Sequence, residues 1–329
     1  MRKIERIIYT MRFSTPRPFA KLATSVALAG TLGLAGGAVT LAQDATPAGT
    51  PIGPEASCIA PTASGDADTG AATTMASPVA TEAPEGTPVE DQAVIDEATA
   101  FVQNLYACYN AGDGEAFLAH FTENGHAAVF GDEHDDAELA EHIAAKSAVA
   151  QASEVDVHEV VDYGDGTIGV DYQVLLGQQI IHNNGVLTQV DGGWLIDGRT
   201  SMAPETQLDS TTASVKASVD GDAVVIEVSP SPLANQPAVK LQITNNADSA
   251  INVLLLQGGD AASVTSADLT ALPEGVTFVG DVHNVGAGEI VDTAFEGLAE
   301  GQYVIVVQTA DGATGSYDLT IDPPFDPEA

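Results

Sequence analysis

The stretch YACYNAGDGEAFLAHF, residues 106–121, joins two helical patterns through a glycine-containing corner. Apolar residues recur at helical spacing from Val94 to Tyr109, and Gly112 then ends the pattern. Asp113 is a suitable N-cap for a second helix. Phe117 and Phe121 are four residues apart, so both should project from one face toward the first helix. The chain must therefore adopt a fold in which two helices pack across a tight corner.

The limits of the helices follow from their flanking residues. Thr87 is predicted to cap the first helix, with Pro88 at its first position and Glu90 completing a capping box. Asn124-Gly125 is predicted to end the second helix. A third helix is expected over about 136–150, opened by acidic residues that suit the helix dipole.

Beyond residue 150 the apolar period changes from helical to two. The segments 154–163, 167–176, 179–190 and 193–198 read as strands separated by Gly-Asp-Gly and Asp-Gly-Gly turns. Helices followed by a hairpin-linked antiparallel sheet predict an α+β domain over 87–202. After a short linker, eight further strand-like segments without a helix pattern predict an all-β sandwich over 211–325.

The N-terminus is predicted to direct export. A basic segment precedes the small-residue apolar run LATSVALAGTLGLAGGAVTLAQ, which is typical of a signal peptide over 1–42. The alternative is an uncleaved membrane anchor, because the run is long enough to span a bilayer. Residues 43–86 are rich in Ala, Thr, Pro, Gly and Ser without an apolar period, which predicts a disordered linker. We therefore expect a secreted or cell-surface protein.

The net charge of −37 limits the partners of the chain. Without residues 1–42, the chain has four basic residues and 46 acidic ones. The basic residues are Lys146, Arg199, Lys216 and Lys240. A surface of this charge repels nucleic acid and anionic lipid, so neither is expected as a partner. It favours solubility instead.

Cys58 and Cys108 are the two cysteines of the chain. Their spacing fits no zinc motif. Export permits a disulfide between them, but Cys108 lies in a helical pattern and is expected to act as a small buried hydrophobic residue.

The first domain resembles the SnoaL-like branch of the nuclear-transport-factor-two-like superfamily. The resemblance rests on Tyr109 to Asp113 at the end of the first helix and on Asp191 to Trp194 at the entry to the last strand. It implies an α+β cone-shaped barrel, in which a curved sheet wraps around helices and encloses an apolar cavity. It also implies that homodimers can form through this domain.

The second domain resembles a cupredoxin-like Greek-key sandwich. The motifs are LQITNN, EIVDTAF, EGLAEGQYVIVV and the final YDLTI. In that family a strand that begins with a tyrosine is followed by the Cys, His and Met that bind copper. Here the corresponding strand begins at Tyr303, and Gln308-Thr309-Ala310 follows it instead. His283 is the only histidine of the domain. A blue-copper centre needs two histidines and a thiolate together, so we expect no copper and no other cofactor.

Six residues are candidates for lining the cavity that the SnoaL-like resemblance implies: Tyr106, Tyr109, Phe130, Tyr172, His182 and Trp194. Tyr172 shares the apolar face of its strand and is expected to face the cavity, whereas Asp171 is expected to face water. Tyr109 suits the core equally well. Trp194 is expected to close the cone, with its indole N–H bonded to the backbone.

His182 has the parity of apolar residues in its strand, which leaves two interpretations. We favour a hydrogen-bonded core histidine, and the alternative is a general base that works with an aspartate. Members of the resembled superfamily that are enzymes use such an Asp or His in the cavity. The two interpretations are distinguished by whether His182 and an aspartate lie within hydrogen-bond distance of each other beside one cavity.

These observations favour an exported, non-catalytic protein whose first domain binds a small apolar ligand or mediates association. The copper-less second domain would be a structural or adhesive module. One alternative is an isomerase, lyase or cyclase acting on a hydrophobic small molecule in the cavity. Another is metal scavenging by the histidine- and acid-rich segment 120–142, although no paired-His motif occurs there and we predict no metal site.

Overall fold

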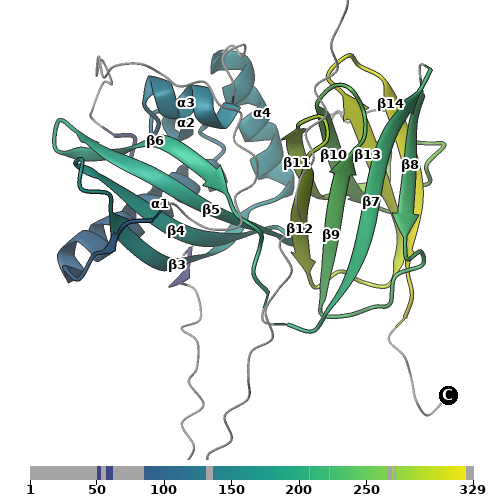
Figure 1. Ribbon diagram of the computed structural model, residues 1–329, viewed down its shortest axis with the longest axis horizontal. Helices are drawn as coiled ribbons and strands as arrows, with labels where there is room; N and C mark the ends of the chain where they lie inside the picture. The colour runs from purple at the N-terminus through teal and green to yellow at the C-terminus, as the bar shows by residue number, and fades with distance from the viewer. Residues whose placement is uncertain are drawn as a thin grey trace, which may run out of the picture. The chain divides into compact units, whose positions relative to one another are not determined.

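A computed structural model of the protein describes residues 50–52, 57–61, 85–130, 136–206, 208–221, 223–264, 269 and 272–323. Strands predominate among these residues and helices are few, as Figure 1 shows. The predicted signal peptide, 1–42, lies outside the described residues. In the described part of the chain, no helix has the length and apolar character needed to cross a membrane.

The helical corner forms where the sequence predicts it. Helix α1 (Gln92–Asn110) ends before Gly112, which has a positive φ of 68°, and α2 (Gly114–Leu118) follows. The Asp113 side chain caps α2 by accepting a hydrogen bond of 2.9 Å from the backbone N–H of Ala116. Helix α4 (Asp136–Val149) confirms the predicted third helix.

Two predicted helix limits are wrong. Thr87–Pro88 forms the short strand β2, which pairs with the end of β3 (Ala152–Asp162), and Asp91 is the N-cap of α1. Main-chain pairing with a neighbouring strand therefore overrides the local capping signal. Asn124 and Gly125 do not end a helix but lie inside α3 (Glu123–Phe130).

The α+β part contains an antiparallel sheet built from β3, β4 (Thr167–Leu176), β5 (Gln179–Val190) and β6 (Gly193–Ser201). These strands confirm the period of two in the sequence. Asp191 and Gly192 both have positive φ, which gives the tight turn between β5 and β6. The helices lie over one face of the sheet (Figure 1). The cone-shaped barrel itself stays a prediction.

Helix α3 approaches β6 so closely that Gly125 has no room for a side chain. A Cβ atom at this position would overlap the carbonyl oxygen of Ile196, which belongs to the sheet backbone and cannot rotate away.

We expect Gly125→Ala to lower the free energy of unfolding by about 1–3 kcal/mol, because the added methyl group overpacks a fixed contact. Gly198→Ala in β6 is the control, since its Cβ would meet only ordinary contacts at 3.8 Å. Urea denaturation of both variants measures the difference. Equal stabilities would show that α3 does not pack on β6 in this way.

The C-terminal part consists of two sheets. One contains β7 (Ser210–Asp220), β8 (Ala223–Ser229), β9 (Ala238–Asn245) and β12 (Ile290–Glu296) in the order β12-β9-β7-β8. The other contains β11 (Thr277–Val285), β10 (Ile251–Gln257), β13 (Gly301–Thr309) and β14 (Thr314–Ile321). Buried side chains such as Leu241, Leu255 and Ile305 from both sheets form one core, as in a β-sandwich.

Strand β5 continues the first sheet into the second part. Ile180 pairs with Ala294 and Gln179 with Phe295 of β12, so the strands form one ten-stranded sheet. All residues that the structure describes accordingly belong to one compact unit. The proposed division at 202 and 211 stays a prediction.

Part of the predicted linker is ordered. Thr50–Pro51 forms strand β1, which pairs with β3, and Cys58 is disulfide-bonded to Cys108 of α1. Asn104 accepts a hydrogen bond from the N–H of Ile59 and donates one to its carbonyl oxygen. The expectation that Cys108 is a free buried residue is therefore wrong, although its side chain is buried.

Candidate functional site

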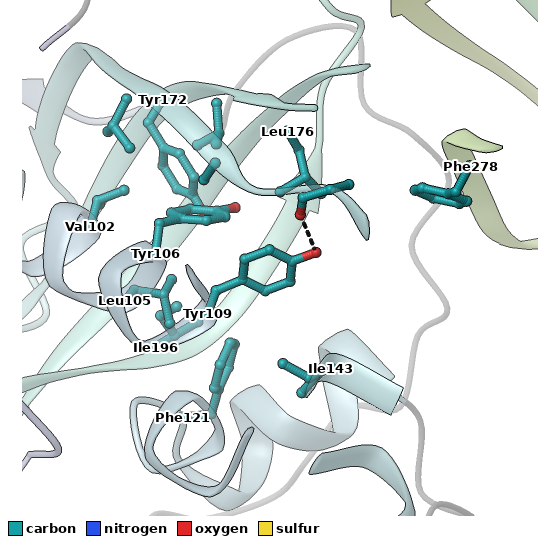
Figure 2. Packing of buried hydrophobic residues seen from close by; sticks show 14 of the residues in the cluster. Val102, Leu105, Tyr106, Tyr109, Phe121, Ile143, Tyr172, Leu176, Ile196 and Phe278 are labelled. Carbon is teal, nitrogen blue, oxygen red and sulfur yellow. Dashed lines mark hydrogen bonds between the residues drawn. The ribbon is translucent and has the colours of Figure 1, made fainter. Parts of the chain in front are cut away.

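The helix-covered face of the β3–β6 sheet carries a chain of aromatic side chains. Tyr172 of β4 contacts Tyr106 of α1 with ring centroids 6.3 Å apart, and Tyr106 contacts Tyr109 at 6.3 Å. The chain continues through Phe117 to Phe121. Figure 2 shows both α1 tyrosines pointing toward the sheet. The corner therefore does what its sequence predicts, since it turns the phenylalanines toward α1.

Polar groups lie on the same face. Residues directly paired across neighbouring strands point to the same side, and Asn183 of β5 pairs with Tyr172. Asn183 is 1% exposed, and its Nδ2 atom forms no hydrogen bond of good geometry within the described part of the chain, although the amide lies close enough to the Tyr172 hydroxyl to act on the pKa of that phenol. Gly185 pairs with Arg199 of β6, and a Cβ at Gly185 would lie 3.4 Å from the ring of Tyr172. Arg199 therefore belongs to this face too.

The two buried phenols respond to one another and to Arg199. Burial raises the pKa of Tyr106 well above its usual range, the neighbouring Tyr172 raises it further, and the positive charge of Arg199 acts in the opposite direction. Burial also raises the pKa of Tyr172, again opposed by Arg199. Both hydroxyls therefore stay protonated; that of Tyr106 is directed as a donor toward the Tyr172 oxygen, so the proton of Tyr172 remains for a further acceptor. Asn183, Tyr106, Tyr172 and Arg199 are called the inner polar group below.

Tyr109 has a structural role. Its hydroxyl donates a hydrogen bond of 3.0 Å to the carbonyl oxygen of Ala150, drawn as a dashed line in Figure 2. Burial raises its pKa, and the negative charge of Asp281 adds to that effect. The Tyr109 hydroxyl is used in this hydrogen bond, which holds the end of α4 against α1. Tyr109 is therefore a residue of the core, as one of its two predicted roles requires.

Phe130 and Trp194 lie at the border of this core and are half-buried. The Phe130 ring contacts Phe121 at 5.3 Å and His126 at 5.2 Å. The indole N–H of Trp194 points to Glu97 Oε2 at 3.5 Å, so the predicted backbone partner is wrong. Neither residue belongs to the inner polar group.

His182 lies on the opposite face of the sheet from Tyr172. It pairs with Gln173, and neighbouring residues along a strand alternate between faces, so the predicted shared cavity with Tyr172 is wrong. His182 Nε2 is 2.6 Å from Asp171 Oδ1 and Nδ1 is 2.8 Å from the Ala203 carbonyl oxygen. Burial alone would lower its pKa, but the bond to Asp171 raises it above the usual value.

The predicted exposure of Asp171 is therefore also wrong, since its side chain is only 17% exposed and bonds to His182. The histidine and aspartate do meet, but not beside the inner polar group. None of the six candidate residues lines the surface hollow beside β2 and β3 that Val89, Ile95 and His158 help to form.

The segment 120–142 does not bring its histidines together in the described residues. His120 is buried between the Ala116 carbonyl oxygen and Asn104, and His126 is 3.2 Å from Asp136. His142 contacts the His283 ring with centroids 5.8 Å apart. His134 lies outside the described residues.

Sequence reasoning missed Asn183 and Arg199 as site residues. Arg199 carried a usable signal, because it is one of four basic residues after position 42 and directly follows the predicted strand 193–198. Asn183 carried none, because both it and Asn184 are polar residues within one strand and only the register with β4 tells their faces apart.

No family model and no curated protein matches the sequence. The structure is similar to auracyanin B, with 23% identity, a TM-score of 0.26, and coverage of 37% of this chain and 94% of auracyanin B. Auracyanin A, a blue copper protein from Chloroflexus aurantiacus, has 16% identity, a TM-score of 0.24, and coverage of 35% and 100%.

A domain of unknown function with a cystatin-like fold from Nostoc punctiforme has 22% identity, a TM-score of 0.27, and coverage of 37% of this chain and 82% of that domain. Cupredoxins and a cystatin-like domain are thus among the structural neighbours. Scores at this level give no ground for assigning a function.

Proposed function

We propose that the protein is an exported, non-catalytic binder of a small apolar molecule that carries a carboxylate or carbonyl oxygen. The buried Nδ2 atom of Asn183 carries this proposal, because its interaction with the Tyr172 hydroxyl does not reach good hydrogen-bond geometry. A buried amide without a partner is costly, so a ligand oxygen that accepts its hydrogen bond would be favoured.

The surroundings of Asn183 define the ligand chemistry. Tyr172 supplies a further donor and both phenols supply apolar rings, and Arg199 forms no ion pair with any described acidic side chain. A guanidinium group binds a carboxylate strongly, which makes an apolar carboxylic acid the preferred class.

A binding role fits the geometry better than catalysis. The His182–Asp171 pair, which a general base mechanism would use, lies on the other face of the sheet from Asn183. A molecule held beside the inner polar group would not reach that pair. The C-terminal sandwich then serves as a structural module.

Export is supported by the leader-like N-terminus and by the Cys58–Cys108 disulfide, since such bonds persist in oxidising compartments. Association as a homodimer is an accompanying proposal, which native mass spectrometry of the secreted protein addresses together with any ligand mass.

The matched variants Asn183→Leu and Asn184→Leu test the binding proposal. Both residues are 1% exposed neighbours in β5, but Asn184 points to the opposite face, where it accepts a hydrogen bond from Tyr163. We expect Asn183→Leu to weaken binding of decanoate, the probe, by about 5–150-fold while the fold persists, because the ligand loses its hydrogen bond to Nδ2.

Isothermal titration with decanoate and with decan-1-ol measures the effect, and Arg199→Met should remove the preference for the carboxylate. Asn184→Leu should keep the affinity of the parent protein. Absence of any bound mass and of decanoate binding in the parent, or equal affinities for both leucine variants, would reject the proposal.

A further inference from the structure

Three side chains from neighbouring strands meet on the face of the sheet opposite to the inner polar group. His158 of β3, Asp171 of β4 and His182 of β5 place one ligand-type atom each within 4.8 Å of one another. Among the residues that the structure describes, this is the one group of three His, Cys, Asp or Glu side chains that could hold a metal ion.

An irregularity in β3 brings His158 into the group. The pairing with β4 shifts between Val157 and Glu159, so His158 is the extra residue of a bulge. Bulges redirect a side chain relative to the regular pleat. His158 thereby comes to 3.6 Å from Asp171 Oδ1 through Nδ1, and its ring centroid lies 5.4 Å from that of His182.

The outward nitrogen of His182 is bonded to an acceptor, whereas that of His158 lies near both an acceptor and a donor. His182 Nδ1 lies 2.8 Å from the Ala203 carbonyl oxygen, and His158 Nε2 lies 3.4 Å from Asp156 Oδ2. His158 Nε2 also lies 3.4 Å from the Gln173 Nε2 donor, whose Oε1 accepts from the Glu205 N–H, and this bond must be given up when Nε2 carries a proton and donates to Asp156. In protein metal sites the non-ligating imidazole nitrogen donates to a carboxylate or carbonyl in this way, and the other nitrogen then directs its lone pair at the metal.

We propose that His158 Nδ1, Asp171 Oδ1 and His182 Nε2 form a three-ligand site for a divalent transition-metal cation of the zinc type. Tetrahedral zinc with bonds near 2.0–2.1 Å needs ligand atoms about 3.3 Å apart. The Nε2–Oδ1 distance of 2.6 Å must open slightly and the Nδ1–Oδ1 distance of 3.6 Å must close slightly, which side-chain rotation accomplishes.

The burial of the group suits a site that keeps one position open. The side chains of His182, Asp171 and His158 are 4%, 17% and 26% exposed, so the group runs from the interior to the surface. Three protein ligands with a fourth, solvent-facing position form the arrangement that zinc adopts when it binds water or an outside ligand.

Zinc titration of the full mature chain tests the site. The chain is first stripped with a chelator and then titrated by isothermal calorimetry in excess Ca²⁺, which saturates the many carboxylates that bind through oxygen alone. We expect one zinc ion per chain, and Co²⁺ in its place should give the visible absorption of a tetrahedral site with nitrogen ligands.

His158→Gln is the decisive variant, because His158 is the most exposed ligand and its loss should leave the fold intact. We expect zinc affinity to fall at least 100-fold, and Asp156→Asn, which removes only the outer acceptor, to lower it about 10–100-fold. His126→Gln is the control, since His126 faces a single described acid, Asp136, and should bind zinc as the parent does.

Circular dichroism confirms that each variant is folded. The proposal is overturned if the parent binds no zinc in the presence of Ca²⁺, or if His158→Gln and His126→Gln bind it equally, which would indicate adventitious binding to the acidic surface. These outcomes are independent of decanoate binding on the opposite face.

Discussion

A Lys146→Met variant is expected to lose about 3–5 kcal/mol of its free energy of unfolding at neutral pH, because it leaves a buried carboxylate without its counter-charge. Lys146 Nζ of α4 lies 2.6 Å from Asp281 Oδ1 of β11, and the two side chains are 15% and 3% exposed. Methionine keeps most of the aliphatic length of lysine, so the change isolates the charge.

The environment of Asp281 explains the size of the effect. Burial by itself raises the pKa of Asp281, but the charge of Lys146 and the hydrogen bond from His283 outweigh it and hold the pKa well below its usual range. His283 Nε2 lies 2.7 Å from Asp281 Oδ2. The Asp281 backbone is bonded at both its N–H and its carbonyl oxygen to the side chain of Gln179.

The dependence on pH has a defined sign. A carboxyl group whose folded pKa is depressed contributes stability above its unfolded pKa of about 3.9, and this contribution disappears as the pH falls through the folded pKa. In Lys146→Met, burial dominates and the pKa of Asp281 should rise. The stability lost in the variant should therefore be greatest at neutral pH and shrink on acidification toward pH 5.

Chemical denaturation at pH 7 and pH 5 measures both effects. Lys216→Met is the control, because Lys216 is exposed on β7 and its loss should change stability by less than about 0.5 kcal/mol. The double variant Lys146→Met/Asp281→Asn should recover most of the loss, since no buried charge remains. A loss below about 1 kcal/mol in Lys146→Met would mean that α4 does not pair with β11 in solution.

The regular elements were largely predictable from local pattern. The helical spacing between residues 94 and 109, the glycine stop and the change to a period of two reproduce α1, α4 and β3 to β6. These features are encoded within each segment, because the apolar face of a helix or strand is written in its own residues.

The predictions were wrong where contacts with residues far away in the sequence determine the local structure. Thr87 satisfies every local rule for a helix cap, yet its main chain pairs with Asp162 of β3, which is 75 positions later. Likewise, nothing in the sequence near Cys58 indicates order, which comes from the bond to Cys108 and from the hydrogen bonds between Ile59 and Asn104.

The candidate site shows the same limit. The alternation of apolar and polar residues shows which way each side chain points only when one face of a strand is apolar and the other polar. Strand β5 is instead buried along both faces from Gln179 to Leu187, apart from two half-buried positions. His182 therefore looked like a member of the cavity wall, and its register with Gln173 places it with Asp171 instead. Neither a strand bulge at His158 nor an ion pair between Lys146 and Asp281 leaves a local signature.

Removal of the Cys58–Cys108 disulfide is expected to lower the free energy of unfolding by about 2–4 kcal/mol, because the cross-link restricts the unfolded chain. The two cysteines are 50 residues apart in the sequence, and a loop of this length lies in the range where the entropic contribution is substantial. Cys58→Ser/Cys108→Ala is the appropriate double variant, since Cys108 is fully buried and alanine adds no polar atom there.

The measurement separates the covalent bond from the local contacts beside it. Asn104→Ala removes the two hydrogen bonds to Ile59 and the contact with His120 but keeps the disulfide, and it should still cost about 1–3 kcal/mol less than the double variant if the cross-link dominates. Limited proteolysis should cut the double variant near residues 57–61 before it cuts Asn104→Ala. If both variants unfold at the same urea concentration, the cross-link contributes no more to stability than the side-chain bonds of Asn104 do, and the expected dominance of the disulfide is wrong.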